Sequence, residues 1–109
     1  MTISISTHIL DQESGQPAAE LAVTLLDDAG RELSKARTDL DGRISEWPGF
    51  GSGQTGGYTL QFDVAGWFAG RGQRCFYRTV QIEFEADTDR HYHVPLLLNR
   101  YGYTTYRGS

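Results

Sequence analysis

Apolar and polar residues alternate along most of this chain. In residues 2–10, three isoleucines fall on one face of an extended strand, and two serines and a histidine fall on the other: Ile3, Ile5 and Ile9 against Ser4, Ser6 and His8. The same alternation predicts further strands over residues 19–27, 31–39, 58–64, 76–86, 91–99 and 102–109, and a short one within 44–50. Residues 65–72 leave room for only one or two helical turns.

Turn-forming residues separate these segments at regular intervals. About eight short strands spaced in this way are typical of a β-sandwich, so we predict an all-β fold. The polar segment 31–39 fits a place near a sheet edge. The length of 109 residues suits a single domain, which we place over residues 1–109.

Residues 51–56, GSGQTG, match the G-x-G-x-x-G pattern of phosphate-binding loops. This pattern binds a pyrophosphate only between a strand and a helix, where the helix N-terminus meets the phosphates. The segment that follows, YTLQFDV, alternates as a strand instead. We therefore predict a plain mobile loop here.

Composition excludes several classes of protein. The net charge of −4 and the pI near 5.2 argue against a dedicated nucleic-acid binder, which would carry a basic stripe. Cys75 is the only cysteine, so no internal disulfide is possible. No window approaches the ~20 apolar residues of a membrane span. The first residues lack a basic start followed by a long apolar stretch, so we expect no signal peptide and a cytoplasmic protein.

The three histidines are the first candidates for chemistry. His8 lies opposite the isoleucine face of its strand. If the apolar residues of 91–99 with even numbers face the core, His91 and His93 point away from it, on the same face as Pro95 and Leu97. That face is too apolar for ordinary exposure to solvent, so we expect another subunit to cover it.

Three interpretations of these histidines stay open at this point. They can be ordinary surface imidazoles, or His8, His91 and His93 can form an open zinc site. No carboxylate is clearly placed to orient the rings of such a site. Alternatively, an imidazole that titrates near neutrality can take a proton from water and return it to a leaving nitrogen.

Arg43 follows the turn formed by DLDG. An arginine in this position is ordinarily a solvated loop residue. If it points into a site instead, its planar guanidinium can hold an imide or urea-like group through two hydrogen bonds. It would also stabilise negative charge that develops on an oxygen.

The C-terminal segment LLLNRYGYTTYRGS is unusual for a chain end, because such tails are commonly small, polar and frayed. This one keeps tyrosines and arginines almost to Ser109. We predict that the tail is an ordered strand and part of an active site.

Three stretches together resemble the 5-hydroxyisourate hydrolase family, also called transthyretin-like proteins. They are STHILDQESGQPA near the start, TDLDGR in the middle, and HYHVPLLLNRYGYTTYRGS at the end. The terminal Tyr-Arg-Gly-Ser is the most specific, because the enzymes of the family end with it and the hormone carrier transthyretin does not. One departure is Asn99-Arg100, where family members commonly have Ser-Pro.

The resemblance implies a sandwich of two four-stranded sheets with one short helix, assembled as a homotetramer with active sites where dimers meet. It implies hydrolysis of 5-hydroxyisourate without a cofactor. It also implies a set of functional residues: catalytic His8, Arg43, His93 and Ser109, with substrate contacts from His8, Arg43, Tyr106 and Arg107. His91 is a weaker candidate. The alternative is a non-catalytic, transthyretin-type protein that binds a small molecule.

Overall fold

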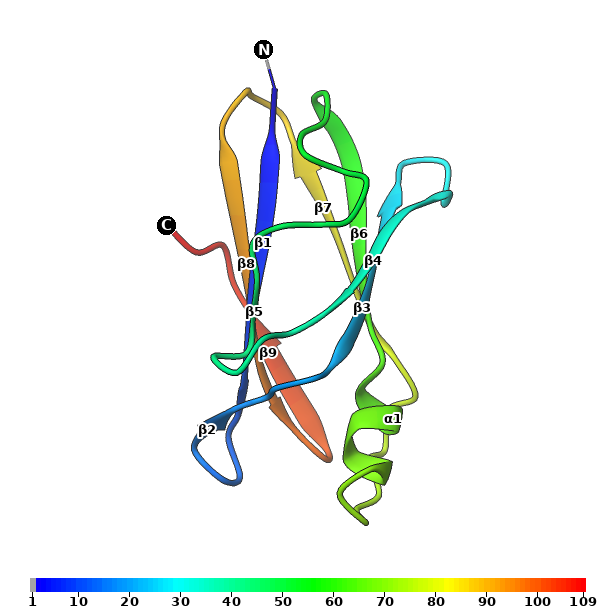
Figure 1. Ribbon diagram of the computed structural model, residues 1–109, viewed down its shortest axis with the longest axis vertical. Helices are drawn as coiled ribbons and strands as arrows, with labels where there is room; N and C mark the ends of the chain where they lie inside the picture. The colour runs from blue at the N-terminus through cyan, green and yellow to red at the C-terminus, as the bar shows by residue number, and fades with distance from the viewer. Residues whose placement is uncertain (1) are drawn as a thin grey trace.

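The computed structural model describes residues 2–109. Two β-sheets pack face to face, and one short helix lies at one end of the sandwich (Figure 1). Along the chain the elements are β1 (Ser4–Asp11), β2 (Gln16–Pro17), β3 (Ala22–Asp27), β4 (Glu32–Arg37), β5 (Arg43–Ile44), β6 (Gly56–Phe62), α1 (Val64–Ala69), β7 (Val80–Ala86), β8 (His91–Asn99) and β9 (Gly102–Thr105). The all-β sandwich expected from the alternation is confirmed.

The two sheets differ in size. The first has the strand order β2-β1-β8-β9, with β5 paired to β1 as a fifth strand, and the second has the order β4-β3-β6-β7. The resemblance implies four strands in each, so the difference is the two-residue strand β5. The polar strand β4 lies at a sheet edge, as expected. Within the first sheet, β1 and β8 run parallel, whereas β8 and β9 are antiparallel.

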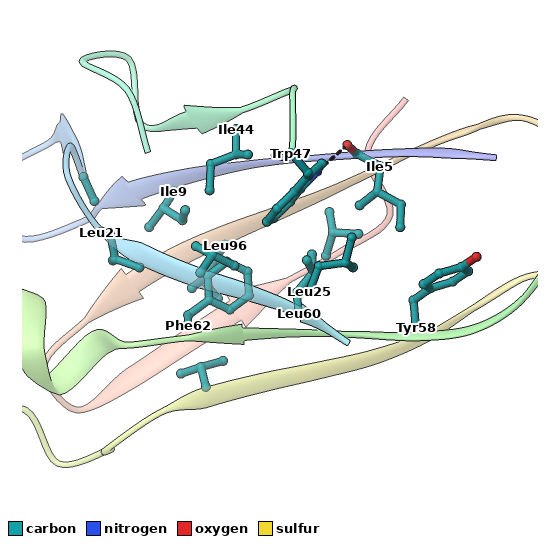
Figure 2. Packing of buried hydrophobic residues seen from close by; sticks show 14 of the residues in the cluster. Ile5, Ile9, Leu21, Leu25, Ile44, Trp47, Tyr58, Leu60, Phe62 and Leu96 are labelled. Carbon is teal, nitrogen blue, oxygen red and sulfur yellow. Dashed lines mark hydrogen bonds between the residues drawn. The ribbon is translucent and has the colours of Figure 1, made fainter. Parts of the chain in front are cut away.

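The core lies between the sheets and is built from the apolar residue of each alternating pair. Isoleucines and leucines of β1, β3, β6 and β8 are buried there, as Figure 2 shows for Ile5, Ile9 and Leu96. Trp47 lies in the connection after β5 and is only 5% exposed. Its indole N–H donates to the carbonyl oxygen of Ile5 at 2.9 Å (Figure 2). This bond ties the connection to β1, which carries part of the candidate site.

The helix is short, as predicted for residues 65–72. The side chain of Asp63 caps α1 by accepting the N–H of Gly66, and Val64 and Phe68 are buried beneath it. Among residues 2–109, no helix is long and apolar enough to cross a membrane. The cytoplasmic location stays a prediction.

The glycine-rich segment 51–57 leads into β6 and not into a helix, as predicted. It is shorter as a loop than expected, because β6 already begins at Gly56. Gly53 also exchanges two backbone hydrogen bonds with Ile3, at 2.8 and 3.0 Å. The segment thus covers the start of β1.

The prediction of a continuous strand over 102–109 is wrong beyond Thr105, where β9 ends. The interruption falls opposite Pro95, which has no N–H to donate to the next residue of the tail. The Thr105 hydroxyl donates to the Pro95 carbonyl oxygen at 2.8 Å. The chain then rejoins β8 in the same register, where Gly108 forms a single bridge with His93. In Figure 1 the red tail accordingly runs back alongside β8.

Candidate active site

The outer face of the first sheet carries two neighbouring pairs of polar side chains. The parallel register places Ser4 beside His91 and Ser6 beside His93. The residues that alternate with them on both strands are buried in the core, so these four side chains project outward. The outward direction expected for the two histidines is therefore confirmed.

Strand β5 adds a guanidinium to this face. Arg43 lies directly opposite His8 in the antiparallel pairing of β5 with β1, so both side chains are on the same side of the sheet. The preceding turn is held by Asp39, whose carboxylate accepts the N–H groups of Asp41 and Arg43, both at 2.9 Å. This turn explains the TDLDGR motif: it aims Arg43 at the histidines.

Gly42 is required for the same turn. Its φ of +76° lies in the left-handed region that favours glycine. A Cβ at this position would also lie 2.5 Å from the carbonyl oxygen of Ile9 in β1. Only glycine therefore lets β5 approach β1 closely enough to place Arg43 opposite His8.

The C-terminal tail closes over His93. The N–H of Gly108 donates to the carbonyl oxygen of His93 at 2.8 Å, and the imidazole ring packs against the Gly108 backbone. Arg107 places its guanidinium 5.3 Å from the ring centroid of Tyr92, which holds the tail through a cation–π contact. Only part of the tail is a strand. Its contribution to an active site stays a prediction.

Two cavities adjoin His93. The first has a volume of about 190 Å³ and is lined by His93, Arg43, Ser109, His91 and Ser6, together with Thr7, Ile44 and Ser45. The second, of about 280 Å³, lies between β7 and the tail and is more apolar; its lining includes His93, Tyr106, Arg107, Tyr92, Val94 and Phe84. His93 is the residue that the two cavities share.

The structure thus divides the predicted site residues into groups. Arg43, His93 and Ser109 line the first cavity, whereas Tyr106 and Arg107 line the second. His8 lines neither cavity in the single chain. It lies beside Arg43 on the same face, half-buried.

His93 has a pKa below the ordinary value of 6.5 for histidine. Burial of the ring is the main cause, because it disfavours the charged form. Electrostatic repulsion from Arg43, and after it from His8 and His91 when these are protonated, lowers the pKa further. At neutral pH the ring is therefore uncharged and able to accept a proton.

Ser6 is a site residue that the sequence interpretation missed. Its hydroxyl oxygen lies 2.7 Å from Nδ1 of His93 and 2.7 Å from Nε2 of His91. Among residues 2–109, no hydrogen bond involves Nε2 of His93, the nitrogen left for a ligand. The alternation placed Ser6 on the same face as His8, but only the pairing of β1 with β8 reveals its contact with His93.

The surroundings of His91 differ from those expected for an open zinc site. Both ring nitrogens of His91 contact serine hydroxyls, with Ser4 at 2.6 Å and Ser6 at 2.7 Å. Within the described part of the chain, no group of three or more His, Cys, Asp or Glu side chains is arranged to hold a metal ion.

Comparison with known proteins gives a family for this fold and site. The model of the HIUase/Transthyretin family matches residues 5–108, which include β5, β8, all of β1 except Ser4, and the tail as far as Gly108. The chain belongs to the HIUase/Transthyretin family.

The known proteins similar to this chain include 5-hydroxyisourate hydrolases and a transthyretin. A 5-hydroxyisourate hydrolase from Caulobacter vibrioides is 42% identical over 113 residues, covering 96% of this chain and 97% of that protein. The structure of Klebsiella pneumoniae 5-hydroxyisourate hydrolase superposes with a TM-score of 0.89 at 36% identity, covering 97% of this chain and 98% of the other. Sea bream transthyretin in complex with thyroxine superposes with a TM-score of 0.85 at 26% identity, covering 96% and 94% of the two chains. The family resemblance stated from the sequence is confirmed.

Proposed function

We propose that this member of the HIUase/Transthyretin family hydrolyses 5-hydroxyisourate to 2-oxo-4-hydroxy-4-carboxy-5-ureidoimidazoline in urate degradation. Its enzyme relatives at about two-fifths identity over nearly the whole chain support this proposal. The structural observation that carries it is His93, an uncharged imidazole whose Nδ1 contacts Ser6 and which shares a cavity with Arg43 and Ser109.

The proposed reaction begins with attack of water on a cyclic amide. Nε2 of His93 takes a proton from the water as its oxygen bonds to the carbonyl carbon. When the carbon–nitrogen bond breaks, Nε2 of His93 returns that proton to the departing ring nitrogen. Water is thereby added across the bond, and His93 ends in its starting state.

Arg43 supplies the positive charge of the proposed mechanism. Among residues 2–109 its guanidinium has no carboxylate in salt-bridge contact, so its donors are available to a substrate. In that place the guanidinium binds the flat, carbonyl-edged substrate and stabilises the oxygen that becomes negative during attack. His8 lies beside it, and Ser109 orients the water or a substrate oxygen. Tyr106 and Arg107 contact the substrate from the second cavity.

We further propose that the active protein is a homotetramer, a dimer of dimers with its sites at the dimer–dimer interface. The site face is open in the single chain, with Arg43 exposed and Tyr106 56% exposed. A second copy over this face would exclude water from Arg43 and His93, which strengthens their interactions with a substrate. Light scattering after gel filtration measures the mass and tests this assembly.

The second candidate function is small-molecule binding without reaction. The apolar lining of the larger cavity and the similarity to a transthyretin that binds thyroxine favour it. Calorimetric titration with thyroxine distinguishes the two functions, because a carrier binds the hormone and leaves 5-hydroxyisourate to decay at its spontaneous rate.

The decisive assay is the ultraviolet-monitored decay of freshly made 5-hydroxyisourate. We expect the native protein to speed the decay and His93→Ala to lose about 10²–10⁴-fold in kcat/KM, the usual contribution of an acid–base group. The same assay compares Arg43→Ala with a matched control, Arg37→Ala. Arg37 is also an exposed arginine, but it lies on the second sheet. A decay rate unchanged by the native protein would contradict the proposed function.

A further inference from the structure

A continuous line of hydrogen-bonding groups runs along the outer face and alternates between β1 and β8. Ser4 Oγ lies 2.6 Å from Nδ1 of His91, and Nε2 of His91 lies 2.7 Å from Ser6 Oγ. Ser6 Oγ in turn lies 2.7 Å from Nδ1 of His93. The line starts at Ser4, passes through the exposed ring of His91, and ends at the half-buried ring of His93 beside Arg43.

The Ser6 hydroxyl links the protonation states of the two imidazoles that it contacts. Ser6 has a single proton, so it can donate to only one of its two ring partners and must accept from the other. When both rings are neutral, the nitrogens of His91 and His93 that face Ser6 are therefore in opposite states, one protonated and one bare. If Nδ1 of His93 carries the proton, its Nε2 is bare and acts as a base. If Nδ1 is bare, Nε2 carries the proton and acts as a donor.

We propose that Ser6 is a positioning residue that sets the tautomer of His93, and that the Ser6–His91 pair is a proton relay which stores on His91 the proton taken up by His93. This inference deepens the proposed function and rests on it for the substrate. It assigns to Ser6 and His91 roles in proton transfer, while the substrate contacts stay with the residues described above.

Over one turnover the relay returns Ser6, His91 and His93 to their starting protonation states. As Nε2 of His93 takes a proton from the attacking water, Nδ1 passes its proton to Ser6, and Ser6 passes its own to Nε2 of His91. His91 then carries the positive charge with both nitrogens protonated, and His93 stays neutral with its proton on Nε2. When the carbon–nitrogen bond breaks, Nε2 of His93 donates to the departing nitrogen and the two transfers reverse.

The charges around His93 favour this direction of transfer. The groups that face it are His8 from β1, Arg43 from β5, His91 from its own strand, and Glu85, Tyr106 and Arg107 across the second cavity. Burial, and then its positive neighbours, lower the pKa of His93. A proton moved to His91 lies farther from Arg43 and on an exposed side chain, where water solvates the charge.

The first test needs no substrate. Nitrogen NMR of histidine-labelled native protein, recorded at a pH where both rings are neutral, reports which ring nitrogens carry protons. We expect the nitrogens of His91 and His93 that face Ser6 to be in opposite states. We also expect Ser6→Ala to change the tautomer ratio of His93, and the control Thr24→Ala, which removes a hydroxyl from the outer face of the second sheet, to leave it unchanged. Two protonated or two bare nitrogens facing Ser6 in the native protein would overturn the relay.

The second test is kinetic. We expect Ser6→Ala to lower kcat about 10–100-fold, part of the 10²–10⁴-fold typical of acid–base catalysis, with KM changed less than about threefold. Ser6→Thr keeps the hydroxyl and should recover most of this loss. His91→Gln keeps a hydrogen-bonding partner for Ser6 but cannot hold a proton, so we expect about a tenfold loss of kcat.

These outcomes separate the relay from the proposed function. Native kcat across pH 5–9 in both Ser6→Ala and His91→Gln would overturn the relay while leaving the hydrolase proposal intact. A native protein that does not hydrolyse 5-hydroxyisourate would overturn the proposed function, whereas the NMR measurement still decides whether the two tautomers are linked.

Discussion

The imidazole of His93 lies close against the backbone of Gly108. A Cβ at position 108 would lie 2.5 Å from Cδ2 of His93, the ring atom bonded to Nε2. The N–H of Gly108 also donates to the carbonyl oxygen of His93 at 2.8 Å. The tail therefore limits the position of the ring and covers the edge next to Nε2, and a glycine is needed there.

Substitution Gly108→Ala should impair the reaction more than the fold. The added methyl group forces the ring of His93 to turn, and a displacement of about 1 Å can cost on the order of 10²-fold in rate. We expect a loss of about 10–100-fold in kcat with little change in the urea midpoint, because the tail packs outside the core. Gly51→Ala is the matched control, since a Cβ there meets no atom within 4 Å. Native activity in Gly108→Ala would show that the ring tolerates displacement.

Substitution Gly42→Ala should impair both stability and activity. Gly42 and Gly30 have similar φ angles, +76° and +81°, but only at Gly42 would a Cβ clash with backbone, 2.5 Å from the Ile9 oxygen. We expect Gly30→Ala to lower the free energy of unfolding by about 1 kcal/mol from the backbone conformation alone, and Gly42→Ala by about 3 kcal/mol or more. Urea denaturation measures both.

The variants Gly42→Ala and Gly30→Ala also test the placement of Arg43. Displacement of β5 should lower kcat/KM in Gly42→Ala, whereas Gly30→Ala should keep the native value, because Gly30 lies in the turn between β3 and β4 of the second sheet. Equal losses of stability in the two variants would contradict the close approach of β5 to β1.

The lowered pKa of His93 predicts a pH dependence of stability. Because the folded pKa lies below the unfolded value, the unfolded state binds more protons between the two. The stability contributed by neutral His93 is therefore fully present above the unfolded pKa of about 6.5 and is lost as the pH falls through the folded pKa. Subtracting the unfolding free energies of His93→Asn from those of the native protein across pH 4–8 isolates this contribution. A difference that grows as the pH falls would have the wrong sign.

The activity should also depend on the protonation state of His93. If neutral His93 is the base, as proposed, kcat/KM should hold below pH 6.5 and fall only as the pH approaches the lowered pKa. Arg43→Ala removes a nearby positive charge and should raise the pKa of His93, which NMR titration of the ring measures directly. A pKa of His93 unchanged in that variant would mean that Arg43 lies too far from the ring to act on the substrate beside it.

The bond from Trp47 to Ile5 predicts a stability effect next to the site. Trp47→Phe removes the indole N–H and leaves the buried carbonyl oxygen of Ile5 without this donor, so we expect a loss of about 1–3 kcal/mol. Trp67→Phe is the control: its N–H donates to the carbonyl oxygen of Ala19 at 2.7 Å, but in a partly buried place where water can substitute. Thermal unfolding compares them, and an equal or larger loss in Trp67→Phe would contradict the role assigned to burial.

The sequence by itself determined which sides of β1 and β8, the strands that carry the histidines, face the core. The period of two is a local property of extended backbone, so the isoleucines of β1 and the apolar residues of β8 predict the outward direction of the histidines without knowledge of strand pairing. Family motifs likewise identified His8, Arg43, His93 and the tail as candidates. Their roles in the reaction stay predictions.

Only the tertiary structure decided which outward residues meet. The parallel pairing of β1 with β8 joins residues more than eighty positions apart, and its register, which no local pattern encodes, places Ser6 beside His93. The sequence likewise did not reveal that β9 ends at Thr105, because the backbone N–H that is missing there belongs to Pro95 on the neighbouring strand. Local alternation determines faces, whereas contacts across strands depend on how the whole chain closes its core.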